Sequence, residues 1–509
     1  MSPADPQVPN RGLLTVCVMA ATIMQALDTT IANVALPYMQ GSLSATQDQI
    51  TWVLTSYIVS AAIFMPTTGF LTARFGRKKL LITAVAGFTI ASGLCGAAQT
   101  LGQMVVFRLL QGVFGAALVP MSQAILLDSY PREKHGSAMA IWGVGVMVGP
   151  ILGPMLGGWL TEYYNWRWVF YINVPIGVAV VFGLIAVLTE SKTERTRFDW
   201  FGFGTLSLAV GALQMMLDRG QLVDWFASTE IVIEAGLAAL ALYLFLVHTA
   251  TAEKPFIDPQ LFRDHNFRVG IMLIFVVGVI LLASVALLTP YLQTLMGYPV
   301  LTAGLILGPR GIGTMVAMMI VGRLITKVDP RVFLMIGFGL SAISLYDMTA
   351  FTPDVSSRTL LWNGILQGTG LGFLFTPLST VTFATLPAHL RTQATALFSL
   401  LRNLGSSIGV SVVIFMLARN TQAIHAELAQ YANPLNPALR HFPVDRIWDL
   451  KTMAGRAALN MEITKQAEII AYMNDYKLLA ILALAAAPLV LLLGKPQARA
   501  IDPAHAVME

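Results

Sequence analysis

Two residues of opposite charge, Asp28 and Arg108, lie in stretches of sequence that are otherwise apolar. Asp28 stands in "LDTTIANVALP", after a run from Leu13 to Ala26 without any charge, and Arg108 stands in "VVFRLLQG". A lone aspartate or arginine at the centre of a bilayer costs about 2.5–3.5 kcal/mol on insertion scales, and pairing or a water-filled cavity lowers this cost. A carboxyl group beside a guanidinium can take up and release a proton as the pair loosens and closes.

The depths of the two side chains follow from helical rise. A helix that starts near residue 12 and ends near Pro37 places Asp28 about 13 Å below its outer end. A returning helix that starts near Met104 places Arg108 about 6 Å below the same surface. We therefore expect Asp28 to line a central cavity and exchange a proton, with Arg108 controlling its proton affinity. The alternative is a static buried ion pair that fixes helix packing.

The chain that must position this pair is strongly apolar. It has 509 residues, of which 56% are hydrophobic and 12% charged, with a mean hydropathy of +0.69, whereas soluble domains carry about 25% charged residues. Segments of about 20 apolar residues match a hydrocarbon core of about 30 Å, and about fourteen occur. They begin near residues 12, 50, 80, 104, 136, 168, 199, 229, 268, 301, 332, 358, 391 and 474. We predict an all-α integral membrane protein and no cleavable signal, because the first apolar segment is too long.

Basic residues orient these spans. With the N-terminus in the cytoplasm, about eighteen basic residues fall on the inside, as the positive-inside rule requires, among them Arg132, Lys327, Arg331 and Arg391. The short outside loops carry Arg167, Arg219 and Arg358. The net charge of +5 is then explained by cytoplasmic loops that face anionic lipid, and no nucleic-acid partner is needed.

The chain repeats itself at a separation of 253 residues, which becomes 256 further on, where "LLQG" ending at Gly112 returns as "ILQG" ending at Gly368. "PYMQ" at Pro37 returns as "PYLQ" at Pro290, and "GFLTARFGRK" at Gly69 returns as "GRLITKVDPR" at Gly322. Two six-helix halves with an extra helix pair between them are the simplest architecture. The predicted parts are a cytoplasmic tail (1–11), a first half (12–189), a linker with two additional helices (190–267), a second half (268–494) that includes an extracytoplasmic loop (419–477), and a second cytoplasmic tail (495–509).

The charged pair is not repeated. Leu281 stands where the repeat would place Asp28, and Gly364 stands where it would place Arg108. A structural need common to both halves would not produce this asymmetry, so we expect the chemistry to belong to the first half. In the second half, two arginines fall in mid-span and need water, a partner or an anionic ligand. The candidates for lining a substrate cavity are Thr29, Asn33, Gln111, Arg310 and Arg402.

Two further segments are candidates for conformational gating. In "GVGVMVGPILGPMLGG" the glycines recur every four residues on one helix face, which lets two backbones approach closely, and the prolines bend the helix; simple close packing is the alternative. The residues concerned are Gly145, Gly149, Pro150, Gly153, Pro154 and Gly157. In the loop after the second span, we expect basic residues to latch the cytoplasmic side onto acids of the moving half, although the positive-inside signal alone also accounts for them. These loop residues are Arg74, Gly76, Arg77, Lys78 and Lys79.

Taken together, these segments resemble the major facilitator superfamily, and within it the fourteen-span drug:proton antiporters of the EmrB/QacA type. "LDTTIANVALP", "GFLTARFGRKK", "FRLLQGVFGAA", "GVGVMVGPILGPMLGG" and "WRWVFYINVPIG" are similar to motifs of that family, and the resemblance covers nearly the whole chain. One departure is Ala73, which stands where the loop motif usually carries Asp. Asp128, at the inner end of the fourth span, is the candidate to replace that acid.

The resemblance implies a proton-driven exporter of hydrophobic or amphipathic compounds that works by alternating access in the bacterial inner membrane. It implies no cofactor and no enzymatic activity, and we find no cluster of metal ligands or catalytic groups at one depth. The alternative is a dedicated exporter of one metabolite or weak acid with the same fold. The hydrophilic segment 419–477 is a candidate docking surface for a periplasmic membrane-fusion adaptor that leads to an outer-membrane channel.

Overall fold

The computed structural model describes residues 10–191, 193, 197–433, 436–437, 448–449 and 451–494. Within these ranges all regular elements are helices, and thirteen of them are long and apolar enough to cross a membrane. A further helix of 28 residues, α17 (Ser357–Ala384), is more polar than these thirteen helices. It packs against two of them, α15 and α16. The prediction of an all-helical membrane protein with about fourteen spans is confirmed.

The first half contains six spans. They are α1 (Arg11–Ser42); α3 (Trp52–Phe64), which continues through a short 3-10 turn into α4 (Thr68–Phe75); α5 (Arg77–Ala97); α6 (Leu101–Gly115), continued by α7 (Leu118–Ser129); α8 (His135–Tyr163); and α10 (Asn173–Val187), which follows the single turn α9 (Trp168–Tyr171). The additional pair is α11 (Trp200–Arg219) and α12 (Thr229–Thr251). Helix α11 packs against both α3 and α18, so it touches both halves.

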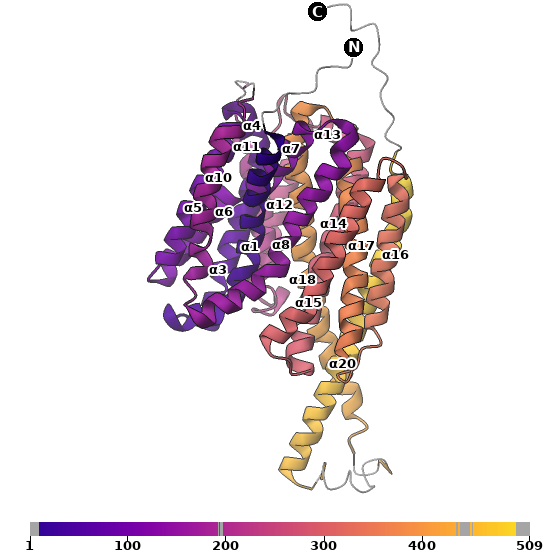
Figure 1. Ribbon diagram of the computed structural model, residues 1–509. Helices are drawn as coiled ribbons and strands as arrows, with labels where there is room; N and C mark the ends of the chain where they lie inside the picture. Colours follow the sequence, from indigo (N-terminus) through magenta and orange to yellow (C-terminus); the bar gives the residue numbers. More distant parts are fainter. Residues whose placement is uncertain are drawn as a thin grey trace, which may run out of the picture.

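The second half repeats this arrangement. Its spans are α14 (His265–Pro290), α15 (Val300–Leu324), α16 (Pro330–Met348), α17, α18 (Arg391–Ala429) and α20 (Met453–Ala486). Helix α1 starts and α20 finishes at the same end of the bundle, which we call the terminal side (Figure 1). The opposite end, which we call the hairpin side, carries a projection formed by α18 and α20 (Figure 1).

In that projection the last helix starts well before the predicted membrane span. Helix α20 begins at Met453, about 20 residues before the predicted start near 474, so much of the expected loop 419–477 is helix. With 39 and 34 residues, α18 and α20 are about 58 and 51 Å long, far longer than a core of about 30 Å. His425 Nε2 and Asn460 Oδ1, 3.1 Å apart, join the two helices beyond the membrane. Hydropathy missed these extensions because it marks only the part of a helix that lies in lipid.

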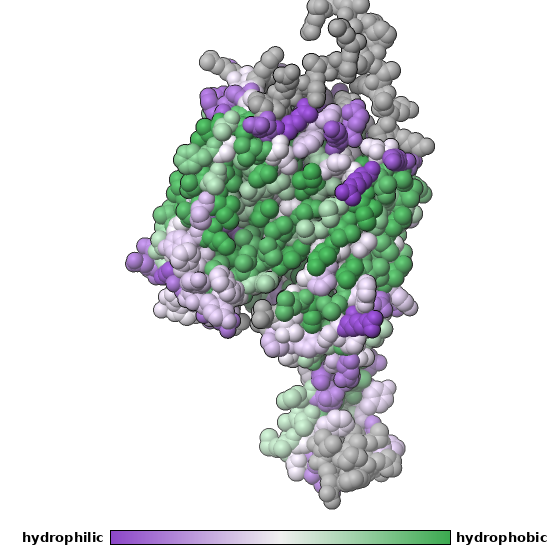
Figure 2. Space-filling view, in the orientation of Figure 1, coloured by the Kyte–Doolittle hydropathy of each residue, from purple (hydrophilic) through white to green (hydrophobic). Residues whose placement is uncertain are grey.

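Figure 2 shows the surface that a bilayer would cover: hydrophobic residues form a broad band over the middle of the helices, and hydrophilic residues gather at both ends. At the helix ends, polar side chains cap free backbone N–H groups. Thr100 accepts a hydrogen bond from Gln103 N at the start of α6, and Ser356 accepts one from Thr359 N at the start of α17. Gly76 joins α4 to α5 at φ +85°, a conformation that favours glycine. The predicted tails, 1–11 and 495–509, lie almost wholly outside the described residues.

Candidate functional site

Asp28 and Arg108 meet in the interior of the first half. Asp28 comes from α1 and Arg108 from α6, and Arg108 Nη1 lies 2.7 Å from Asp28 Oδ2. Both side chains are fully buried. Helical rise predicted depths of about 13 and 6 Å below the outer surface, and the long arginine side chain bridges this difference to reach Asp28. A charge-assisted bond of this length in a dry interior is far stronger than one at the surface.

Carboxamides satisfy the second carboxylate oxygen. Asp28 Oδ1 accepts a hydrogen bond from Gln111 Nε2 at 2.8 Å and another from Asn173 Nδ2 at 3.3 Å. Asn173, at the start of α10, also donates to Ser92 Oγ on α5 at 3.1 Å. The carboxylate of α1 is therefore held by α6 and α10, and α5 supports Asn173 through Ser92; all four helices belong to the first half. We call Asp28, Arg108, Gln111 and Asn173 the carboxylate cluster.

The guanidinium is held as firmly as the carboxylate. Arg108 Nε donates to Val53 O at 2.9 Å, and Nη1 also donates to Gln111 Oε1 at 2.8 Å. The ring of Tyr57 lies against the guanidinium, with its centroid 4.4 Å from Cζ, a cation–π contact. Tyr57 OH accepts a hydrogen bond from Gln25 Nε2 at 3.2 Å. Arg108 Nη2 is buried without a partner in the described part of the chain, so one donor of the fork is free to bind a water molecule or a displaced carboxylate.

This arrangement differs from the expectation that Asp28 and Gln111 line a central cavity. Both side chains are fully buried among helices of their own half. The prediction placed them by depth alone, and depth does not determine which way a helix is rotated. In this conformation, the carboxylate cluster is a fully buried ion pair inside the first half.

The second half lacks such a cluster at the equivalent position. Gln367, the repeat of Gln111, is fully buried with both its amide nitrogen and oxygen unsatisfied among the described residues. Arg310 extends from α15, where Nη2 donates to Leu281 O and to Ser284 Oγ, both at 3.0 Å. Only 7% of Arg310 is exposed in this conformation, and its role in lining a substrate cavity stays a prediction. The arginine faces the interior of the second half.

The other three cavity candidates lie differently. Thr29 is partly exposed and Asn33 is exposed, four residues further along the same face of α1. The neighbouring face of α1, at Ala26 and Thr30, packs on α8 instead. Arg402 is partly exposed and hydrogen-bonds Asn403 Oδ1 only at 3.4 Å. These three side chains remain available to a ligand.

Arg402 shares a face of α18 with residues that touch the first half. Thr395, seven residues before it, donates through Oγ1 to Pro120 O on α7 at 3.0 Å. Two helical turns carry Arg402 about 10 Å further from the terminal side on that face. The position of Arg402 therefore lies near the junction between the halves.

On the terminal side, a shared acid joins the two halves. Asp128, at the end of α7, lies 2.5 Å from Arg77 Nη1 of the first half and 2.5 Å from Arg391 Nη1 at the start of α18. These side chains are 10–24% exposed, so the pairs are only partly screened by water. We call Arg77, Asp128 and Arg391 the terminal latch. We expected the loop cations to reach acids of the other half, but Asp128, an acid of the first half, binds a cation of the second.

Helices α8 and α15 extend this contact. Ser137 Oγ donates to Gly322 O at 3.1 Å, and Gly143 faces Met318 one and a half turns further along α8. The two halves are thus closed against each other on the terminal side. Among the other loop residues, Lys78 Nζ donates to Ile185 O at 2.8 Å within its own half, and Arg74 is exposed.

The glycine stripe of α8 packs inside the first half rather than between the halves. A Cβ atom at Gly149 would collide with the backbone of Ala26, and one at Gly153 would collide with Thr30. Thr30 Oγ1 donates to Gly149 O at 2.9 Å across this seam. Gly145 and Gly157 face α1 in the same way. The geometry is that of close packing, while the side chains of Pro150 and Pro154 lie outside the described part.

Sequence reasoning missed two buried polar residues. Asn173 lay within a quoted motif, but a lone asparagine at a helix start has no signature that marks it as a carboxylate ligand. Asp475 of α20 is fully buried beside Asn420 of α18, and among the described residues neither of its oxygens has a hydrogen-bond partner in good geometry. It was missed because the last span was predicted to begin near residue 474. An acid at the very start of a span is usually assigned to the preceding loop.

Comparisons with known proteins agree with this architecture. Residues 18–410 match the Major Facilitator Superfamily. The chain is 38% identical over 428 residues to the multidrug export protein EmrB of Escherichia coli K12, covering 84% of both proteins. It is 37% identical over 489 residues to the fatty acid resistance protein FarB of Neisseria gonorrhoeae, covering 95% of this chain and 96% of that protein. The solved structure of the proton:xylose symporter XylE shares the fold, with a TM-score of 0.61 at 12% identity over 94% of both chains.

Proposed function

The chain belongs to the major facilitator superfamily, and we propose that it is a proton-coupled exporter of hydrophobic or amphipathic compounds in the bacterial inner membrane. The observation that carries the proton coupling is the carboxylate cluster, an ion pair buried in one half and missing from the other. The export of drug-like compounds is supported by the 38% identity to EmrB. Moving one charge through 100 mV provides about 2.3 kcal/mol, which suffices to concentrate a substrate outside.

We assign the terminal side to the cytoplasm, because the basic loops lie there. The conformation closed by the terminal latch is then the outward-facing state of an alternating-access cycle. A proton that reaches Asp28 in this state would replace Arg108 as its partner, and the guanidinium would keep its hydrogen bonds to Val53 O and Gln111 Oε1. The neutral acid is the form that a dry interior tolerates best, so the proton would stay bound until the opposite side opens.

The test uses everted vesicles, a panel of labelled compounds and a protonophore. Wild-type protein should accumulate several compounds, and the protonophore should abolish accumulation. Asp28→Asn keeps the shape of the cluster but cannot ionise, so it should lose proton-driven accumulation while still exchanging labelled for unlabelled substrate. Proton-driven accumulation by correctly inserted Asp28→Asn protein would refute the proposal. Glu133→Gln, an exposed acid on the terminal side, is the matched control.

A second candidate function is the export of one class of weak acid, because FarB is a fatty acid resistance protein and matches 95% of this chain. The same panel separates the two functions. A broad exporter shows mutual competition among unrelated compounds, whereas a dedicated one is inhibited only by close analogues of its substrate.

The hairpin side is then extracytoplasmic, and we propose that the projection of α18 and α20 docks a periplasmic adaptor. Large apolar side chains at its far end are exposed, with Tyr431 at 64%, Met453 at 83% and Met461 at 73%. Replacing the chain between His425 and Asn460 with a short Gly-Ser linker joins two ends that are already adjacent. This variant should lose export across the outer membrane but keep transport in proteoliposomes; equal loss in both assays would contradict docking.

A further inference from the structure

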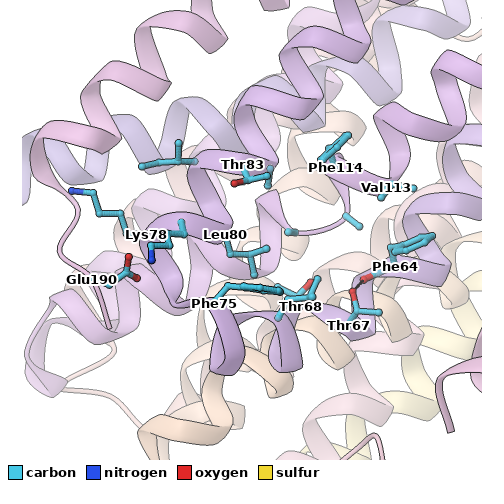
Figure 3. A pocket seen from close by; sticks show the side chains of 16 residues that line it. Phe64, Thr67, Thr68, Phe75, Lys78, Leu80, Thr83, Val113, Phe114 and Glu190 are labelled. Carbon is cyan, nitrogen blue, oxygen red and sulfur yellow. Dashed lines mark hydrogen bonds between the residues drawn. The ribbon is translucent and has the colours of Figure 1, made fainter. Parts of the chain in front are cut away.

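A cavity lies in the first half, away from the carboxylate cluster. It has a volume of about 720 Å³ and is bounded by α3 and α4, by α5 and by α6. Figure 3 shows its two ends: Phe64, Val113 and Phe114 gather at one, and Lys78 and Glu190 at the other. A pocket of this volume is the size that proteins use for one drug-sized ligand.

The mouth of this cavity faces lipid. Thr83 of α5 lines it and is exposed. On the same helix face, seven and eleven residues further, Ile90 is 65% and Leu94 38% exposed, and exposed apolar residues at mid-span lie against acyl chains. A molecule dissolved in the bilayer can therefore reach the cavity sideways, without crossing the aqueous phase.

The depth of the cavity matches one leaflet. Phe75, half exposed at the end of α4, marks its shallow end, and Phe64 marks its deep end. The eleven residues between them span about 16 Å of helix, close to half of a hydrocarbon core of about 30 Å. The cavity thus runs from the terminal surface to the middle of the bilayer, parallel to the acyl chains of the leaflet.

Charge is confined to the shallow end. Lys78 and Lys79 supply two ammonium groups there, and Glu190 supplies one carboxylate. Lys78 Nζ donates to Ile185 O, which leaves two of its three donors for a ligand, while Lys79 is exposed. The surplus of one positive charge suits a head group with a single negative charge, and the apolar remainder of the cavity suits one hydrocarbon chain.

We propose that this cavity binds a single-chain amphipathic carboxylate drawn from the cytoplasmic leaflet, as the site where such a substrate is collected before export. The collecting role rests on the exporter function proposed above, whereas the binding itself does not. Val113 and Phe114, at the deep end, lie on the same helix α6 as Gln111. Occupation of the cavity therefore presses on the helix that carries two members of the carboxylate cluster.

Binding is tested on the purified full chain in nanodiscs with hexadecanoic acid that carries a photoreactive diazirine near its methyl end. Labelled peptides should include residues 64–84 or 113–117, and unlabelled hexadecanoate should compete. Thr83→Trp fills the mouth and should abolish labelling, whereas Ile90→Trp, on the same lipid-facing stripe outside the cavity, should not. Lys79→Gln should weaken competition about two- to fivefold, the size of one exposed ion pair, and Lys327→Gln, an exposed lysine on the same side, should leave it unchanged.

Three results would overturn the proposal. Labelling that maps elsewhere, or that survives Thr83→Trp, excludes the cavity as the site. Stronger competition by phosphatidylglycerol than by hexadecanoate identifies a bilayer-lipid site instead. Undiminished export of hexadecanoate by Thr83→Trp in everted vesicles removes the collecting role. Labelling is read without transport, so a chain that binds the probe but exports nothing would refute the proposed function and leave the binding site standing.

Discussion

The terminal latch can be tested with two variants, each of which removes one of the two arginines that pair with Asp128. Arg77 and Arg391 each lie 2.5 Å from one oxygen of Asp128. Only the pair with Arg391 joins the two halves, because Arg77 and Asp128 belong to the same half. Removing Arg391 should therefore shift the equilibrium between the outward-facing and inward-facing states, whereas removing Arg77 should chiefly affect local stability.

The size of this shift follows from burial. The side chains of Arg391 and Asp128 are 10% and 15% exposed, so the pair is worth more than a surface ion pair of about 0–1 kcal/mol. A hydrogen bond to a charged group contributes about 1.5–3 kcal/mol, and residual exposure lowers this to about 1–2 kcal/mol. Arg391→Gln should then favour the inward-facing state by about 5- to 30-fold, while Arg77→Gln should change the ratio less than about twofold.

Spin-label distances measure this ratio directly. The two cysteines of the chain, Cys17 and Cys95, are buried, so cysteines introduced at the exposed Lys134 and Lys327 can be labelled selectively. These positions lie on the terminal side of the two halves. The longer-distance population should grow in Arg391→Gln and stay small in Arg77→Gln. Equal shifts in both variants, or none in either, would refute the assignment of the latch.

Three further predictions follow from close packing and buried polar groups. Gly149→Ala forces a methyl group against the Ala26 backbone and should cost about 1–3 kcal/mol of stability, seen as a lower Tm of the purified protein. Gly158→Ala is the control, because an added methyl group there meets open space, and it should leave the Tm unchanged. An equal loss of Tm in both variants would contradict the close packing of α8 on α1. Asp475→Asn replaces a buried acid, which lacks well-placed donors among the described residues, by a neutral amide. It should raise the Tm by a few degrees, roughly 1 kcal/mol. A lower Tm would show that the carboxylate is well paired. Gln367→Leu removes two unsatisfied amide atoms from the second half and should be neutral or stabilising, while a marked loss of transport would reveal a bound partner there.

The sequence contained enough to predict the spans and the meeting of Asp28 with Arg108. Both predictions need only local information, namely apolar run length and the rise of a helix. The direction in which Asp28 points was not predictable, because the rotation of α1 is set by its neighbours. Its glycine seam with α8 and its contacts with α6 and α10 turn the carboxylate into the bundle and leave Thr29 and Asn33 on the opposite side.

The terminal latch shows a similar limit. Asp128 was proposed to replace the missing acid at Ala73, and Arg391 was counted only among the inward basic residues. Their contact joins positions 263 residues apart, which no local pattern records. The start of α20 was misplaced for a different reason, since the hydropathy of a helix that leaves the membrane falls while its backbone hydrogen bonds continue unchanged.

The carboxylate cluster raises a mechanical requirement. Its side chains come from α1, α6 and α10, all in the first half, so a rigid rocking of one half against the other cannot by itself open the pair between Asp28 and Arg108. The described contacts offer one continuous connection: α15 of the second half touches α8, α8 meets α1 along the glycine seam at Gly149, and α1 carries Asp28 on its inner face. A movement of α8 that is transmitted through this seam would shift α1 relative to α6, and spatial continuity alone does not establish such coupling. The decisive measurement is the number of protons released per substrate molecule in Gly149→Ala protein, reconstituted at a temperature where it stays folded. Coupling through the seam requires that this number change. An unchanged number would assign the opening of the pair to water entering the first half.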